Sequence, residues 1–310
     1  MVGRHMAAAT DATTDAPELA PNRTRGSVRQ MVLALAIAVA ITAIFLPVSH
    51  FLGVTFGEYT WGYFIPIVVL KLVPVICVLA LGGRKLLAPH MLRGGEAFRV
   101  AWRLCWLPVV LNLLPFGLGL IGLATGRSEL AVGWPTRLAV GIGLVLTVGI
   151  FEESLCRGLL FQGLLARMGS SRRGIVAASV ISSAFFGIIH VVVGVELNPW
   201  WVLTAVLKIV QAGWIGFLFC VAVIKTRSLL PCFLFHSLFD INVIIGAIFD
   251  QQIGAGAYTT DSPEAAMGQA VMYGIFIIVY VVGSRRALRT LRQIDVPDYG
   301  ELRRGESATS

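Results

Sequence analysis

Six ionisable side chains of the sequence stand inside long apolar stretches, where an unpaired charge is expensive to bury. Carboxylates and imidazoles are the groups that most often transfer protons in general acid–base catalysis. A set that combines both types with one guanidinium therefore suits the activation of a water molecule. The six residues are Glu152, Glu153, Arg157, His190, His236 and Asp240.

The first three of these groups lie within six consecutive residues. Glu153 and Arg157 are four residues apart, so on a helix they share a face and can form an ion pair. Glu152 lies about 100° away around the same helix and must point elsewhere, toward a cavity or another helix. Because the ion pair does not use Glu152, this carboxylate is the candidate general base. The alternative is a buried ion-pair network that only locks two helices together.

The other three groups fall on two later apolar segments. His190 follows Phe186 and Gly187, and the glycine permits a neighbouring helix to approach closely. His236 and Asp240 are four residues apart, so they are expected on one helix face, where they can act jointly on one ligand atom. A membrane histidine can also serve only as a hydrogen-bonding helix fastener, and an aspartate can serve only to orient a histidine.

Three further polar residues of the apolar segments are assigned no chemical role. Asn242 is two residues beyond Asp240, about 200° around a regular helix, and is predicted to face away from it. Lys71 and Lys208 are predicted to be structural, because a lysine can extend its ammonium group to the membrane surface or meet an acidic neighbour.

The composition places these segments in a membrane. Of the 310 residues, 56 % are hydrophobic and only 14 % are charged, and the mean hydropathy is +0.80. A water-soluble domain of this length does not carry such a composition. The net charge of +8 does not indicate nucleic-acid binding, because the basic residues form short clusters between apolar runs. Such clusters are typical of the loops of a multi-pass protein of the cell membrane.

Eight apolar runs have about the 20 residues that a helix needs to cross the hydrocarbon core, which predicts an all-α bundle of eight transmembrane helices. Because Lys and Arg are concentrated in alternate connections, both termini are predicted to be cytoplasmic. The predicted domains are a disordered polar tail (1–29), a transmembrane domain (30–290) and a cytoplasmic tail (291–310). The predicted spans are Gln30–Val48, Trp61–Leu81, Trp102–Thr125, Leu138–Leu165, Gly174–Val195, Trp200–Ile224, Leu229–Phe249 and Met267–Gly283.

The order of the three motifs resembles that of a known family. Glu-Glu-x-x-x-Arg, Phe-x-x-x-His and His-x-x-x-Asn/Asp on successive membrane helices resemble the CPBP group. This group comprises CAAX prenyl endopeptidases and bacteriocin-processing or abortive-infection intramembrane proteases. The resemblance covers about residues 148–245, and a CPBP-like core is expected at 138–250. It implies an intramembrane endopeptidase that hydrolyses a peptide bond.

The resemblance also implies roles for individual residues. Glu152 and His190 are expected to activate the attacking water, and His236 and Asp240 to stabilise the oxyanion of the tetrahedral intermediate. Many relatives carry asparagine in place of Asp240, and an ionised aspartate repels an oxyanion. Asp240 is therefore expected either to be protonated or to serve another role. The supporting residues are Glu153, Arg157 and Phe186.

The same residues determine the expected cofactor and partners. Glu152, His190 and His236 are candidate ligands of a divalent metal such as zinc, although the H-E-x-x-H helix of many zinc proteases is absent. A metal-free reaction is the other possibility. The expected partners are membrane lipid and a prenylated or membrane-embedded peptide or protein substrate, without nucleic acid. The alternative function is a non-catalytic scaffold or bacteriocin-immunity protein that binds a partner through the same cluster, and a transporter is third.

Overall fold

The computed structural model describes residues 28–88, 94–191, 199–249, 263–293 and 302. This described part consists of helices and turns and contains no strand. Eight of its helical runs are long and apolar enough to cross a membrane, which confirms the predicted all-α bundle. The elements are α1 (Val28–Phe56), α2 (Trp61–Ala80), η1 (Gly83–Leu87), α3 (Gly94–Ala124), α4 (Trp134–Glu153), η2 (Ser154–Phe161), α5 (Gln162–Met168), α6 (Arg172–Ile189), α7 (Pro199–Thr226), α8 (Leu230–Phe239), η3 (Asp240–Asn242), α9 (Val243–Phe249), α10 (Pro263–Gly283) and α11 (Arg285–Arg292).

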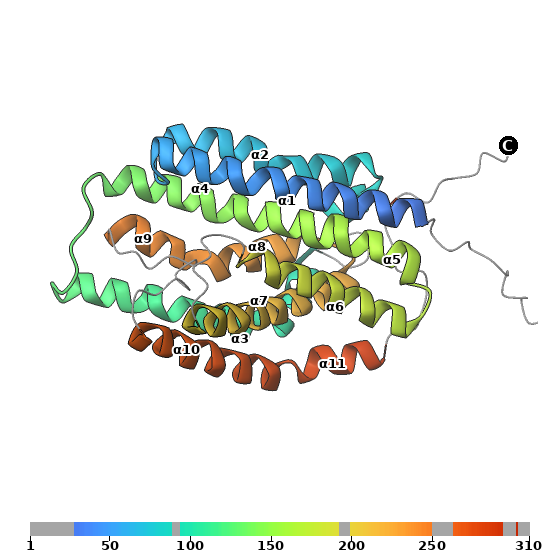
Figure 1. Ribbon diagram of the computed structural model, residues 1–310. Coiled ribbons are helices and arrows are strands. Elements are labelled where there is room, and N and C mark those ends of the chain that lie inside the picture. The colour runs from blue at the N-terminus through green and yellow to red at the C-terminus, as the bar shows by residue number, and fades with distance from the viewer. Residues whose placement is uncertain (1–27, 89–93, 192–198, 250–262, 294–301, 303–310) are drawn as a thin grey trace, which may run out of the picture.

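The first helix begins, and the last helix ends, at the same end of the bundle. Figure 1 shows the start of α1 and the end of α11 at one end of the bundle, as an even number of spans requires. That this end faces the cytoplasm stays a prediction. The predicted tails, 1–29 and 291–310, lie largely outside the described residues, and Val28 and Arg29 already belong to α1.

Several spans differ in length from the prediction. α1 continues to Phe56 instead of ending at Val48, and α3 begins at Gly94 instead of Trp102. α6 ends at Ile189, whereas the predicted span continues to Val195. The prediction is wrong for residues 190 and 191, and residues 192–198 lie outside the described part. The ends of a helix are decided by its backbone hydrogen bonds and caps, which hydropathy does not report.

Two predicted spans contain an irregular turn at the positions of their polar residues. In the fourth span, the π-helical turn η2 stands between α4 and α5. In the seventh span, the 3₁₀ turn η3 stands between α8 and α9. The regular helices predicted over these two spans are therefore wrong at the turns. Irregular helical turns of these kinds are frequent at functional sites.

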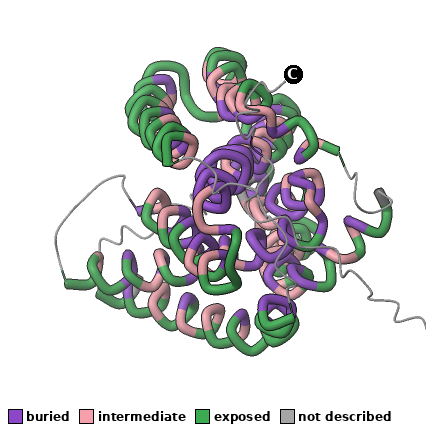
Figure 2. Tube along the Cα trace, turned by 90° about the vertical axis from the view of Figure 1, so that its right-hand side faces the viewer, coloured by how far each residue is buried: buried purple, intermediate pink, exposed green. Residues whose placement is uncertain are grey.

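The spans are arranged in layers around α7. Figure 1 shows α1 and α2 on one side of the bundle and α10 and α11 on the opposite side, with α4, α8 and α7 between them. Within the most apolar part of α7, 72 % of the residues are buried inside the bundle, against 11 % in α1. Figure 2 shows the buried stretches gathered in the middle of the bundle. The outer helices therefore separate the polar residues of the centre from lipid.

Glycines bring α6 and α7 into close contact. A Cβ at Gly187 would overlap the carbonyl oxygen of Ile209, and a Cβ at Gly213 would lie 3.1 Å from the carbonyl oxygen of Ser183. Small residues at helix crossings let membrane helices approach backbone to backbone. The close approach predicted at Gly187 is confirmed, and it places the end of α6, with His190, against α7.

Candidate active site

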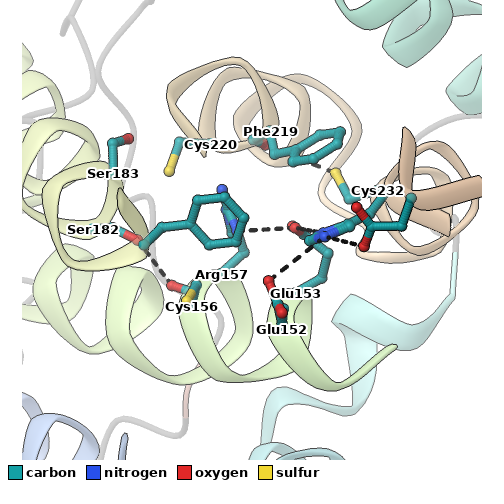
Figure 3. A network of polar contacts seen from close by, with 12 residues as sticks. Glu152, Glu153, Cys156, Arg157, Ser182, Ser183, Phe219, Cys220 and Cys232 are labelled. Atoms are coloured by element: carbon teal, nitrogen blue, oxygen red, sulfur yellow. Dashed lines mark hydrogen bonds and ion pairs between the residues drawn. The ribbon is translucent and has the colours of Figure 1, made fainter. Parts of the chain in front are cut away.

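A buried π-helical turn follows the two glutamates of α4. Every residue of η2 is buried, so its polar backbone groups depend on partners within the protein. Ser182 of α6 supplies one such partner, because its hydroxyl donates to the carbonyl oxygen of Cys156 at 2.9 Å (Figure 3). This hydrogen bond ties η2 to α6 immediately beyond the glutamates.

Glu153 joins two helices through one oxygen atom. Nη1 of Arg157 donates to Oε1 of Glu153 at 2.9 Å, which confirms the ion pair predicted from the spacing. Nδ1 of His236, on α8, lies 2.7 Å from the same oxygen, a contact that the sequence spacing does not reveal. Both members of the ion pair are fully buried. Glu153 therefore fixes α8 against α4 in addition to neutralising Arg157.

Aromatic rings complete the surroundings of Arg157. Its guanidinium carbon lies 4.2 Å from the ring centroid of Phe186 and 5.4 Å from that of Phe219. Such cation–π contacts are strongest where water is excluded. The ring of Phe186 also lies 4.5 Å from the ring of His190, centroid to centroid. Phe186, predicted as a supporting residue, thus contacts both the buried cation and a candidate catalytic histidine.

Gly216 of α7 leaves the space that Arg157 occupies. A Cβ at this position would lie 2.8 Å from Nη2 of Arg157 and 3.1 Å from Cδ1 of Phe186. We expect Gly216→Ala to displace both side chains and to lower the free energy of unfolding by about 1–3 kcal/mol, as overpacking does in other cores. The melting temperature of the purified protein in detergent measures this effect.

The matched control for this prediction is Gly274→Ala in α10. A Cβ at Gly274 meets no atom within 4 Å, so this variant reports only the change in helix propensity. Equal melting temperatures for the two alanine variants would contradict the tight packing around Arg157.

Glu152 points away from the ion pair, as predicted. Its side chain is 20 % exposed, whereas that of Glu153 is fully buried. Oε2 of Glu152 lies 3.6 Å from Nε2 of His190 and 3.6 Å from Nε2 of His236. These separations are longer than direct hydrogen bonds, so the three atoms face one another without bonding directly and leave their polar groups available to a ligand in the cavity. The structure therefore brings three of the four predicted catalytic residues together around one point.

The partners of the two Nδ1 atoms determine where the histidines carry hydrogen. Nδ1 of His190 lies 2.6 Å from the backbone carbonyl oxygen of Phe186, which can only accept. Nδ1 of His236 lies 2.7 Å from the carboxylate of Glu153. Both Nδ1 atoms are thus donors, and both Nε2 atoms face Glu152. In a neutral ring such an Nε2 accepts a hydrogen bond, and in a charged ring it donates one.

Asp240, the fourth predicted catalytic residue, begins the 3₁₀ turn that follows α8. Its Oδ2 lies 3.3 Å from Nε2 of His236, so the pair predicted to share a face does meet. The prediction for Asn242 is wrong, because this residue lines the same cavity as Asp240. The 100° step that places it on the far side holds only in a regular α-helix, and η3 interrupts that step.

A cavity of about 370 Å³ opens beside these groups. Lys208 of α7, predicted to be structural, lies in its wall. The ammonium nitrogen of Lys208 is 5.7 Å from the ring centroid of Tyr273, and Asp240 and Glu152 line the same cavity. The cavity thus combines a charged wall with apolar surfaces, as is common in ligand sites. Further polar residues in its lining are Asn112, Gln211 and Asn242.

The predicted metal ligands supply the right kinds of atom but not the right arrangement. Glu152, His190 and His236 present one carboxylate oxygen and two imidazole nitrogens, which zinc binds in many enzymes. Among the residues that the structure describes, however, no three His, Cys, Asp or Glu side chains are grouped closely enough to hold a metal ion. Nε2 of His236 also faces Asp240. As the described side chains lie, they are not grouped as a metal site, and no step below uses a metal.

The middle of the chain has a recognisable relationship to known proteins. Residues 134–242 match the family model described as type II CAAX prenyl endopeptidase Rce1-like. The matched range runs from the start of α4 to the end of η3 and contains all seven predicted catalytic and supporting residues. The match supports a CPBP-type protease core in this segment. No curated protein and no solved structure matches the chain.

The CPBP core does not form the cavity alone. Both irregular turns, η2 and η3, belong to the core. Asn112 of α3 and Tyr273 of α10 lie outside the matched range and line the same cavity. The helices around the CPBP core therefore contribute to the shape of the candidate substrate site.

Proposed function

We propose that the protein is an intramembrane endopeptidase that hydrolyses a peptide bond with water activated by Glu152 and His190. The observation that carries this proposal is the position of Glu152 Oε2, 3.6 Å from Nε2 of both His190 and His236, at the wall of a cavity. The match of residues 134–242 to a protease family supports a peptidase. The roles of individual residues below are part of the proposal.

Glu152 and His190 are suited to hold one water molecule between them. Because Nδ1 of His190 donates to the carbonyl oxygen of Phe186, Nε2 of the neutral ring is an acceptor, 3.6 Å from Glu152. A water molecule has two hydrogens, and the carboxylate and the imidazole offer one acceptor to each. The water oxygen then keeps a lone pair for attack on the substrate carbonyl carbon while Glu152 takes a proton.

His236 is suited to bind the oxyanion that this attack creates. Its Nε2 stands 3.3 Å from Asp240 and 3.6 Å from Glu152, while its Nδ1 donates to Glu153. Three carboxylates around one ring favour the doubly protonated imidazole, in which both nitrogens donate. The single hydrogen on Nε2 faces Asp240 in the free protein and donates to the oxyanion when the oxyanion forms. The role of Asp240 in this proposal is to keep the imidazole doubly protonated through its negative charge.

The proton that Glu152 takes from water returns to the leaving group. As the tetrahedral intermediate collapses, the C–N bond breaks and its electron pair stays on the nitrogen. Glu152 transfers its proton to that nitrogen, which releases an amine and regenerates the carboxylate. The hydroxyl group derived from water remains on the other fragment as part of a new carboxyl group.

The apolar parts of the cavity indicate a substrate that is itself in the membrane. Phe186, Phe239, Met272 and Phe276 line the cavity beside the charged groups. A lipidated or membrane-embedded peptide or protein presents apolar groups that such walls can cover. We therefore propose a substrate of this class.

Reconstitution of the full chain tests the proposal. In liposomes that contain membrane-tethered reporter peptides, and in water enriched in a heavy oxygen isotope, the protein should release fragments. One heavy oxygen should appear in each new carboxyl group. The alternative, a scaffold or immunity protein, predicts reporter binding without fragments. Reporters that stay intact across a broad library would overturn the proposal.

We expect cleavage to continue after treatment with a strong chelator, because the described donors do not form a metal site. The measurements are the cleavage rate and the metal content of the same sample by mass spectrometry. A zinc-dependent protease treated in parallel shows that the chelator acts. Activity that is lost on chelation and restored by zinc would contradict this prediction.

A further inference from the structure

A second hollow, larger than the catalytic cavity, lies between α6, α7 and α11. Its volume is about 590 Å³ and its lining is almost wholly apolar. Val180 of α6, Val210 of α7 and Leu288 of α11 are among the exposed hydrophobic residues that form its walls. As far as the structure describes the two linings, they have no residue in common. We call this hollow the α6–α11 groove.

The walls of the α6–α11 groove are held in place by a polar contact. Nε1 of Trp214, a lining residue of α7, donates to Oγ of Ser284 at 2.6 Å. Ser284 connects α10 to α11 and is buried. The hydrogen bond therefore fixes the start of α11 against α7, so the groove is a defined surface between packed helices.

The α6–α11 groove has the length of one lipid tail. The lining residues of α6 follow one helix face at intervals of four residues, from Arg172 through Val176 and Val180 to Ala184. At 1.5 Å per residue this face is about 18 Å long. One leaflet contributes about 15 Å to the hydrocarbon core of a bilayer. A groove of this length runs from the end of the helix to about the middle of the membrane.

One end of the α6–α11 groove is strongly basic. Arg172 is the first residue of α6 and Arg292 is the last residue of α11; both are exposed and both line the groove. Arg173 and Arg289 stand on the same two helices. Guanidinium groups bind phosphate through paired N–H donors. Basic pockets at the ends of membrane helices are a recurrent form of anionic-lipid site.

We propose that the α6–α11 groove binds one anionic phospholipid, with an acyl chain along α6 and α7 and the phosphate beside Arg172 and Arg292. A soluble phosphate would use the arginines but leave the apolar walls uncovered. The lipid chain of a substrate would cover the walls without using the arginines. Phosphatidylcholine offers a phosphate, but its quaternary ammonium group opposes the positive charge of α11. The anionic lipid alone matches both ends.

The test is a titration of the purified full chain in neutral detergent with phosphatidylglycerol or with phosphatidylcholine of the same chains. The melting temperature reports binding, because a ligand that binds only the folded state stabilises it. We expect phosphatidylglycerol to act at a concentration at least about tenfold lower than phosphatidylcholine. Glycerol phosphate and inorganic phosphate should cause no shift.

Three variants locate the binding site. Arg172→Gln combined with Arg292→Gln should raise by about tenfold the phosphatidylglycerol concentration that is needed for the same shift in melting temperature. Val180→Trp should do the same by filling the groove. Arg127→Gln, which removes an exposed arginine between α3 and α4 outside the lining, should keep the response of the native chain.

The proposal would be overturned by an equal response to both lipids, by a response that survives the double variant, or by a shift with inorganic phosphate alone. Displacement of phosphatidylglycerol by a prenylated peptide would also overturn it, because the groove would then hold the substrate chain. The readout is stability rather than cleavage, so the result does not depend on the proposed peptidase activity.

Discussion

Glu152→Gln should abolish peptide cleavage while the protein remains folded. Glutamine has nearly the shape of glutamate but cannot take a proton from water, so the rate should fall by about 10²–10⁴-fold. Glu152 takes no part in the buried Glu153–Arg157 pair, and its side chain is partly exposed at the cavity. Folding should therefore be little affected. The measurement is the rate of reporter cleavage in liposomes at matched protein amounts.

The control for this experiment is Glu264→Gln, which makes the same chemical change at an exposed position in the first turn of α10. It should cleave at the native rate. The melting temperatures of both variants should match that of the native chain. Cleavage by the Glu152→Gln variant at the native rate would contradict the proposed mechanism. A large loss of stability in this variant would instead assign Glu152 to the buried structural network.

Arg157→Met should have the largest effect on stability. The substitution leaves the carboxylate of Glu153 fully buried without its guanidinium partner. Loss of one partner of a buried ion pair costs about 3–5 kcal/mol, because the remaining charge is uncompensated. The melting temperature of the purified protein in detergent, or its yield in the membrane fraction, measures this loss.

A double variant separates the lost charge balance from the lost volume. Glu153→Gln together with Arg157→Met removes both charges, and the glutamine oxygen can still accept from His236. We expect the double variant to be more stable than Arg157→Met alone. Arg285→Met, at an exposed position of α11, should resemble the native chain. A double variant as unstable as the single one would show that packing of Arg157, rather than charge, is decisive.

Hydropathy and charge spacing were sufficient to predict the architecture. The number of spans depends on long apolar runs, and these are plain in the composition. The Glu153–Arg157 pair and the meeting of His236 with Asp240 follow from the four-residue repeat of a helix face. The different directions of Glu152 and Glu153 follow from the same repeat.

The remaining features depend on departures from the regular helix or on packing between helices. Asn242 enters the cavity because a 3₁₀ turn replaces the α-helix there, and the hydropathy of the segment does not change at the turn. The contact between Glu153 and His236 joins residues 83 positions apart, which no single-helix rule connects. Lys208 lines the cavity because of how α7 is rotated within the bundle. These facts are decided by three-dimensional packing.

A single carboxylate oxygen, Oε1 of Glu153, receives hydrogen bonds both from the guanidinium of its own span and from an imidazole of another span. The same oxygen atom thus holds α8 against α4 and positions the ring of His236. A displacement of α8 along α4 would break the contact between Glu153 and His236, while the backbone hydrogen bonds within each helix could stay intact. Under the proposed mechanism, cleavage should therefore be lost at a lower temperature than helical content.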